Sequence, residues 1–437
     1  MDTPIVDFVE GYIAQKGVRL HMPGHKGKNF LGCEALDITE IRGADALYEA
    51  EGIIAKSEET AAALFGSGRT LYSTEGSSQC IRAMLYLAVT SSRRTRPVIV
   101  AARNVHKAFV YAAALLDLEV VWLWPEESRS LCACPVMAEA LERTLKTLPE
   151  PPAAVYVTSP DYLGNVQDIK ALAEVAHRYG TILAVDNAHG AYLHFLDAPC
   201  HPLDLGADLC CDSAHKTLPV LTGGAYLHIS KGADMKDSAK GAMALFGSTS
   251  PSYLTLLSLD RCNRYLAQGY SDRLRGTVKR LDALRSTLRR RGWQVEESDP
   301  LRITISAPSG TALAEQLRRH RIECEFADPD FLVLMATPEN SEENFQRLLQ
   351  ALGENSAPTA DHSLPLAKGE RVCSIRQALF GGHETIPTEE ALGRVCAAPT
   401  VGCPPAIPIA VSGERIGSDA LALFHYYGVE TVDVRKE

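Results

Sequence analysis

The sequence predicts an α/β protein whose sheet is mostly parallel and flanked by helices. Between about residues 61 and 245, short apolar runs rich in β-branched residues alternate with helical stretches, which is typical of parallel strands joined by helices. The chain has 437 residues, which is too long for one ordinary core, so we expect two or three domains. Hydrophobic residues make up 46% and charged residues 22%, the usual balance of a soluble globular protein.

The expected strands and helices of this region follow from its hydrophobic pattern. The strands are short apolar segments at 97–101, 119–124, 153–158, 181–185, 208–211 and 224–229. The helices are expected at 77–90, 105–116 and 168–179. The last helix is the clearest, because its apolar residues recur on one face and Gly180 stands at its C-terminal end.

The rest of the chain divides into an arm and two smaller parts. We predict an N-terminal arm over 1–60, a major domain over 61–260, a small α/β subdomain over 261–355 and a C-terminal α/β unit over 371–437. The subdomain should contain a long charged helix at 271–291, followed by strand, helix, strand, strand and helix at 301–306, 311–320, 323–326, 331–335 and 341–352. Residues 354–370 are rich in Pro, Ala and Ser and are the best linker candidate.

Composition argues against several classes of partner. The net charge is −10, whereas nucleic-acid binding needs a basic surface, so we expect no nucleic-acid partner. No stretch reaches the roughly 18 apolar residues of a membrane span, and the N-terminus lacks the features of a signal peptide, so we expect a cytoplasmic protein and no membrane partner. The twelve cysteines form no C-x-x-C pair, which favours reduced, buried thiols and no metal site.

Two motifs at predicted strand ends suggest a cofactor. Lys216, in the motif SAHKT, follows the strand at 208–211, and the C-terminal edge of a parallel sheet is where ligands bind. A lysine there can form an imine with a cofactor aldehyde, although an ordinary solvated lysine is the simpler interpretation. Asp186 follows the strand at 181–185 and can pair with a protonated ring nitrogen, unless it is a helix N-cap or turn aspartate.

Two further motifs fall at the same predicted edge. Ser77 and Ser78 open the helix at 77–90, whose N-terminus suits a phosphate; a plain N-cap is the alternative. His106 follows the strand at 97–101 and can stack on a flat ring, although a lone histidine is more often structural. The order along the chain is therefore anion site, stacking residue, ring-nitrogen partner and lysine, an order that chance does not readily assemble.

These motifs resemble the ornithine/lysine/arginine decarboxylase family of fold-type-I pyridoxal 5'-phosphate (PLP) enzymes. The matching stretches are MPGHKG (22–27), GSS (76–78), NVHK (104–107), TSPDYLG (158–164), VDNAHG (185–190), SAHKTL (213–218), TSPSY (249–253) and LD (259–260). A weaker resemblance continues at RVCAA (394–398) and in the Pro-rich run 401–408, which departs from the family pattern. The chain has no room for the N-terminal wing of the long members, so it resembles the short, wingless bacterial group.

The resemblance implies a role for each site residue. Lys216 resembles the lysine that holds PLP as a Schiff base, and Asp186 resembles the partner of the pyridine nitrogen. His106 would stack on the ring with Ala188 on its other face, and His189 would lie beside the phenolic oxygen. The phosphate would meet four residues, which are Ser77, Ser78, Ser213 and His215. Thr249 and Ser250 would reach the phosphate of a neighbouring subunit, which implies a homodimer with shared active sites.

The function implied is PLP-dependent decarboxylation of arginine, lysine or ornithine to the amine and CO2, as in polyamine biosynthesis. His215 or Lys216 would return the proton to the α-carbon. Glu384 and Glu414 are candidates for the substrate's distal cation, with surface solvation as the alternative. Two other functions compete: another fold-type-I reaction, such as an aminotransferase or lyase step, and a non-catalytic PLP-fold binding protein.

Overall fold

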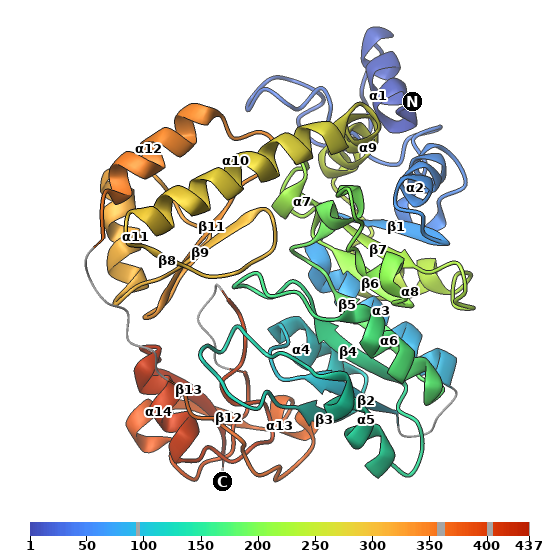
Figure 1. The fold of residues 1–437 in the computed structure, drawn as a ribbon. Helices are drawn as coiled ribbons and strands as arrows, with labels where there is room; N and C mark the ends of the chain where they lie inside the picture. Colours follow the sequence, from blue (N-terminus) through green and yellow to red (C-terminus); the bar gives the residue numbers. More distant parts are fainter. Residues whose placement is uncertain (93–96, 356–362, 400–404, 437) are drawn as a thin grey trace. The chain divides into compact units, whose positions relative to one another are not determined.

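The computed structural model describes residues 1–92, 97–355, 363–399 and 405–436 (Figure 1). The chain divides into two compact units. The first contains Met1–Arg93 and Ile182–Arg273, and the second contains Arg94–Thr181 and Leu274–Glu437. Residues 356–362 of the predicted linker and the start of the Pro-rich run, residues 401–404, lie outside the described residues. The four predicted domain ranges stay a prediction.

The first unit holds four strands in the order β1-β7-β6-β5. Its strands are β1 (Arg69–Ser73), β5 (Ile182–Asp186), β6 (Leu209–Asp212) and β7 (Ala225–Ile229). Strands β5 and β6 are parallel, whereas β7 runs antiparallel to both β6 and β1. Because β5 and β6 are parallel neighbours, their C-terminal ends meet at one edge of the sheet.

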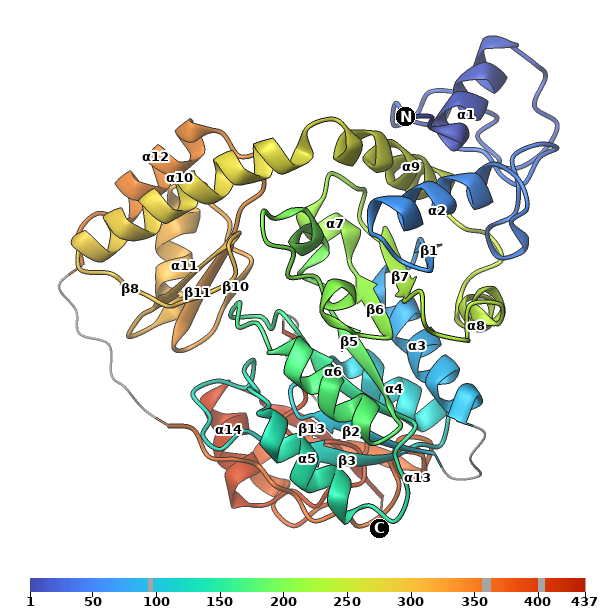
Figure 2. The ribbon, with the colours of Figure 1, turned by 45° about the vertical axis from the view of Figure 1, so that its right-hand side comes forward.

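Helices and 3-10 turns surround these strands. They are α1 (Pro4–Ala14), η1 (Leu47–Glu49), α2 (Ile53–Leu64), α3 (Gly76–Ser92), η2 (Ala191–Phe195), η3 (Pro202–Leu205), α7 (Ala214–Thr217), α8 (Ala239–Phe246) and α9 (Tyr253–Ala267). Helix α3 lies along this sheet in both views (Figures 1 and 2). The N-terminus of α3 follows directly on β1, and α7 follows directly on β6, so both helices begin beside strand ends.

The second unit contains three parallel strands in the order β4-β2-β3. These elements are β2 (Val98–Ala102), α4 (Lys107–Leu115), β3 (Glu119–Leu123), α5 (Ala138–Thr147), β4 (Ala154–Thr158) and α6 (Ile169–Arg178). Asp168 caps α6 by accepting a hydrogen bond from the backbone N–H of Ala171. Strands β1 to β7 number seven over the two units, and the predicted mostly parallel α/β class is confirmed.

The second unit also contains two small antiparallel sheets. The first has the order β10-β11-β9-β8, and Figures 1 and 2 show helices gathered beside it. Its elements are α10 (Tyr270–Arg290, which starts in the first unit), β8 (Gln294–Val295), β9 (Arg302–Ser306), α11 (Gly310–Arg319), β10 (Phe326–Ala327), β11 (Phe331–Met335) and α12 (Glu342–Leu352). The second pairs β12 (His383–Pro387) with β13 (Thr431–Arg435), near α13 (Ile375–Leu379), η4 (Thr388–Glu390) and α14 (Ser418–Tyr426).

Some expected elements differ from the structure. Helix α9 was not predicted, and it begins directly after the Ser/Thr/Pro-rich stretch that ends at Ser252. The reason is local, since the side chain of Ser252 accepts a hydrogen bond from the N–H of Thr255 and caps the helix. The strand expected at 323–326 is wrong over its first three residues, because only Phe326–Ala327 pairs with β11. Among the described residues, no helix is long and apolar enough to cross a membrane.

Candidate functional site

The ends of β5 and β6 bring two chain turns together in the first unit. Asp186 is the last residue of β5 and lies opposite Cys211 of β6 in the sheet register. The backbone N–H of Asn187 donates to the carbonyl of Cys211 at 3.0 Å, so pairing continues one residue beyond the strand. The turn after β5 carries Ala188 and His189, and the turn after β6 carries Ser213 and leads into α7.

Lys216 and His189 meet between these two turns. The Nζ atom of Lys216 lies 2.7 Å from Nε2 of His189, which is buried. Lys216 itself is half-buried on the short helix α7. The amine is therefore held in place from the β5 turn, although the lysine belongs to the β6 turn. This placement contrasts with the simpler interpretation of Lys216 as an ordinary solvated lysine.

His215 points its ring toward the backbone of the next strand. Its Nδ1 lies 3.0 Å from the carbonyl oxygen of Gly224. Because a carbonyl only accepts, Nδ1 carries the proton, and the neutral ring has a bare Nε2. Burial lowers the pKa of His215, and the charge of Lys216 acts in the same direction, while the Gly224 carbonyl opposes them. The neutral form of His215 is therefore favoured.

Asp186 is buried and receives hydrogen bonds from its own sheet edge. Its Oδ1 accepts from the N–H of Ala188 at 3.1 Å and from the thiol of Cys211 at 3.6 Å. Burial raises the pKa of the Cys211 thiol far above its usual range, and the Asp186 carboxylate adds to this effect. The thiol therefore stays protonated and can act as the donor. Sequence reasoning found Asp186 but gave no signal for its thiol partner.

The N-terminus of α3, in the same unit, has features that suit an anion. Gly76 adopts a φ of +70°, and its N–H donates to the carbonyl of Gly223 at 2.7 Å. A Cβ at Gly76 would meet nothing within 4 Å, so the space beside this first residue of the helix is open. The hydroxyl of Ser213 donates to Oγ of Ser77 at 2.9 Å, which ties the β6 turn to this helix. The helix dipole and the first-turn N–H groups that follow Gly76 favour an anion here, beside Ser77 and Ser78.

Thr249 and Ser250 are exposed, and the residue before them contacts the same region. The N–H of Ser248 donates to the carboxylate of Glu75, which directly precedes α3. The loop that carries Thr249 and Ser250 is thereby fixed beside the N-terminus of α3 in its own chain. The predicted reach of this loop to a neighbouring subunit remains a prediction.

The residues of the first unit fit PLP in three respects. The amine of Lys216 suits the cofactor's aldehyde, and the buried carboxylate of Asp186 suits a protonated ring nitrogen. The open N-terminus of α3 suits the phosphate. Ala188 and His189 lie on the turn between these groups, and both are buried.

His106 belongs to the second unit, where it is the N-cap of α4. Its Nδ1 accepts a hydrogen bond from the N–H of Ala108 at 3.1 Å, so the neutral ring carries its proton on Nε2. The ring is half-buried. Part of the structural alternative for His106 is thus correct, since the side chain does cap a helix.

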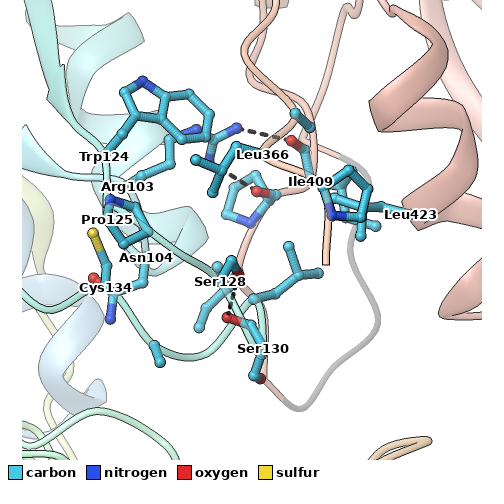
Figure 3. A pocket seen from close by; sticks show the side chains of 16 residues that line it. Arg103, Asn104, Trp124, Pro125, Ser128, Ser130, Cys134, Leu366, Ile409 and Leu423 are labelled. Atoms are coloured by element: carbon cyan, nitrogen blue, oxygen red, sulfur yellow. Dashed lines mark hydrogen bonds between the residues drawn. The ribbon is translucent and has the colours of Figure 1, made fainter. Parts of the chain in front are cut away.

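Arg103 lies on the turn between β2 and α4, and Figure 3 shows its side chain beside Trp124 and reaching toward Ile409. Its guanidinium carbon lies 5.3 Å and 5.1 Å from the ring centres of Trp122 and Trp124. Its two terminal nitrogens donate to the carbonyls of Pro408 and Ile409, at 2.8 Å and 2.9 Å. The described end of the Pro-rich run is thereby docked onto this turn.

The two carboxylates considered for a substrate cation are both engaged by arginines. Glu414 is 7% exposed, lies 3.5 Å from Arg103 and accepts from the N–H of Val411 at 2.8 Å. Glu384 is exposed and pairs with Arg394 at 2.7 Å. Surface solvation is therefore wrong for Glu414, which has a structural contact, and correct for Glu384.

The comparisons with known proteins agree with this geometry. The family model described as Orn/Lys/Arg decarboxylase, major domain, matches residues 3–312. The arginine decarboxylase of Bacillus subtilis (strain 168) is 28% identical to this chain, covering 96% of it and 92% of the relative. The arginine decarboxylase of Halalkalibacterium halodurans has the same identity and coverage. Francisella novicida lysine decarboxylase has a TM-score of 0.83 at 17% identity, covering 99% of this chain and 81% of that one, so it shares the fold.

Proposed function

The chain belongs to the Orn/Lys/Arg decarboxylase family and is a PLP-dependent decarboxylase of a basic amino acid, and from this premise we propose that its preferred substrate is L-arginine. The products would be the corresponding amine, agmatine, and CO2. One observation carries the catalytic part of the proposal: a single sheet edge combines the Lys216 amine, the buried Asp186 carboxylate and an open helix N-terminus. Arginine is favoured by the names of the relatives that align over 96% of the chain.

PLP, when bound, supplies an electron sink for the electron pair that remains when CO2 leaves. Lys216 would hold it covalently through Nζ, and Asp186 would keep a proton on its ring nitrogen. Ser77, Ser78 and Ser213 would donate hydrogen bonds to its phosphate, together with the first N–H groups of α3. The family resemblance supports further contacts of the cofactor with five residues, which are His106, Ala188, His215, Thr249 and Ser250.

Proton return to the α-carbon falls to Lys216 rather than to His215. The neutral form of His215 is favoured, and its single proton is engaged with the carbonyl of Gly224. Its Nε2 therefore has no proton to give under neutral conditions. The amine of Lys216 can donate, and His189, at 2.7 Å, can hold that amine in place while it does so.

The assembly and location of the protein belong to the same proposal. A homodimer with shared active sites is supported by the exposed Thr249 and Ser250, which are available to a second copy of the chain. A cytoplasmic role in forming a polyamine precursor is supported by the arginine decarboxylase relatives. Light scattering of the purified protein, with and without PLP, measures the assembly.

The proposal is tested on purified protein loaded with PLP. L-Arginine, L-lysine and L-ornithine are supplied in turn, and CO2, the amine product and any keto acid are measured. We expect CO2 and agmatine, with kcat/KM for arginine at least about tenfold above the other two, equivalent to about 1.4 kcal/mol. Keto acid without CO2 would identify an aminotransferase. Bound PLP without turnover on a broad amino-acid panel would identify a binding protein.

A further inference from the structure

A fully buried polar pair links the two turns that carry the candidate site. Asn187 follows Asp186 at the end of β5, and Asp212 ends β6 four residues before Lys216. The amide nitrogen Nδ2 of Asn187 donates to Oδ1 of Asp212 at 2.7 Å, and neither side chain is exposed. This hydrogen bond connects the turn after β5 with the end of β6.

Two histidines hold the second oxygen of Asp212. Nε2 of His201 lies 3.0 Å and Nε2 of His228 lies 3.2 Å from Oδ2, and both rings are completely buried. The N–H of Leu203 donates to Nδ1 of His201, so the proton of the neutral His201 ring is on Nε2. Both histidines can therefore donate to Asp212 through Nε2.

The group formed by His201, Cys210 and Asp212 has the residue types of a metal site, but the hydrogen bonds around it explain its arrangement better than a bound metal ion does. Nδ1 of His228 lies 2.8 Å from the hydroxyl of Thr70, which can donate to it and leave the proton of His228 on Nε2. The thiol of Cys210 adds a weaker donor to Oδ1 of Asp212 at 3.6 Å. Although burial acts to raise the pKa of Asp212, the two imidazoles hold that pKa far below its ordinary value, so the carboxylate accepts from every side.

The turn after β5 is built around the side chain of Asn187. The backbone N–H of Gly190 donates to the backbone carbonyl of Asn187 at 2.8 Å. A Cβ at position 190 would lie 2.0 Å from Oδ1 of Asn187, so only glycine allows this close approach. Between these two residues lie Ala188 and His189, and the ring of His189 contacts Lys216.

We infer that Asn187 and Asp212 are positioning residues that fix the spacing between the ring-nitrogen carboxylate of Asp186 and the amine of Lys216. The inference rests on the proposed function, since it assigns these residues to the same cofactor site. His201 and His228 act indirectly, because they contact Asp212 and fix the orientation of its carboxylate. The pair works through Asp186, His189 and Lys216 and needs no contact with the substrate.

The test compares Asp212→Asn and Asn187→Ala with a matched control, Asp208→Asn. Asp208 also connects β5 and β6, because its Oδ2 accepts from the N–H of Leu183 at 2.8 Å, but it lies at the opposite end of the strands. Four quantities are measured: the PLP dissociation constant of the apoprotein, the pH midpoint of the visible imine band, kcat and KM, and the melting temperature of the apoprotein. Asn187→Ala leaves both imidazole contacts of Asp212 intact and is the variant to use if Asp212→Asn does not fold.

We expect each site variant to raise the PLP dissociation constant about tenfold, shift the imine midpoint and lower kcat with little change in KM. The exchanged double variant, Asn187→Asp with Asp212→Asn, should recover part of the loss, because it restores one donor facing one acceptor. The control should lower only the melting temperature. A site variant whose PLP affinity and imine midpoint match the wild type would overturn the inference. Failure of the proposed function is distinguishable, because the wild type would then form no imine band or release no CO2 from arginine.

Discussion

Two buried carboxylates in this protein have opposite electrostatic states. Asp212, in the first unit, faces an amide, a thiol and two imidazoles, and the Coulomb interaction and hydrogen bonds with the two imidazoles keep its pKa far below the ordinary value despite burial. Glu414, in the second unit, faces a full cation, yet burial raises its pKa despite the pull of Arg103. Two partners aimed at one carboxylate oxygen therefore outweigh burial at Asp212, whereas a single, more distant cation does not outweigh it at Glu414.

The reason for the difference is what else each partner does. Arg103 divides its hydrogen bonds between the carbonyls of Pro408 and Ile409 and lies against two tryptophan rings, so Glu414 receives it only at 3.5 Å. The imidazoles of His201 and His228 instead aim one nitrogen each at the same oxygen of Asp212, at 3.0 Å and 3.2 Å. Arg103 chiefly holds the segment of Pro408 and Ile409 in place, and we call this contact the clamp. In the Asp212 cluster, by contrast, the histidine nitrogens are directed at the carboxylate itself.

The largest expected effect separates the candidate site around Lys216, in the first unit, from the contacts of Arg103 and Glu414, in the second unit. Lys216→Ala should lower kcat by at least about 10⁴-fold, or about 5.5 kcal/mol of barrier, because the amine that we propose holds the cofactor is lost. Glu414→Gln should leave the imine band unchanged. Activity assays and visible spectra of both variants measure this. Full activity in Lys216→Ala would contradict the proposed catalytic role of Lys216 and of the first unit.

The second prediction concerns Arg103. Arg103→Met should lower the free energy of unfolding by about 3 kcal/mol, because the buried carbonyls of Pro408 and Ile409 lose their donors. Urea unfolding measures this, with the surface variant Arg178→Met as a matched arginine control. An equal loss in both variants would mean that Arg103 is not a clamp.

The third prediction tests the two carboxylates directly. Asp212→Asn should cost about 2 kcal/mol near neutral pH, because two imidazole donors lose a charged acceptor, whereas Glu414→Gln should cost under about 1 kcal/mol. The folded pKa of Asp212 is depressed, so its contribution to stability is present above about 3.8 and declines as pH falls below that value.

The sign is opposite for Glu414. Its folded pKa is raised above 4.5, so its contribution is full below that pH and is lost as pH rises through the raised value. The cost of Glu414→Gln should therefore shrink with rising pH, while the cost of Asp212→Asn grows. Urea unfolding of both variants and the wild type over an acidic to neutral series measures the two slopes. Parallel slopes would contradict the comparison.

The smallest expected effect concerns an exposed carboxylate, Glu384, with which the two buried carboxylates can be compared. Glu384→Gln breaks an exposed pair with Arg394 at 2.7 Å and should change the free energy of unfolding by under about 0.5 kcal/mol. A thermal melt resolves whether the change is this small. A loss comparable with that of Arg103→Met would mean that burial is not what distinguishes these carboxylates.

The sequence was sufficient for the elements whose pattern is local. Helix α6 and the strand at 331–335 were predicted to within a residue or two, because periodicity and capping residues lie within the segment itself. Strand β1 and helix α9 were missed. Strand β1 is defined by its pairing with β7, which is far away in the chain.

The site shows the same limit. Lys216 and Asp186 were found because each follows a recognisable strand within a motif. Asp212, His201 and His228 were not found, although Asp212 directly precedes the lysine motif. Their partnership joins residues up to 27 positions apart by contacts between buried side chains, which no local spacing indicates. The signal available in the sequence was a charged residue at the end of an otherwise apolar strand.

The clamp at Arg103 has a consequence for how this enzyme can change over time. Arg103 binds the main-chain oxygens of Pro408 and Ile409, and Lys107 binds the main-chain oxygen of Ala406 through its own backbone N–H. Main-chain acceptors are present whatever the side chains are. The segment can therefore accumulate substitutions while keeping its attachment, which makes it a place where mutation can proceed without loss of docking.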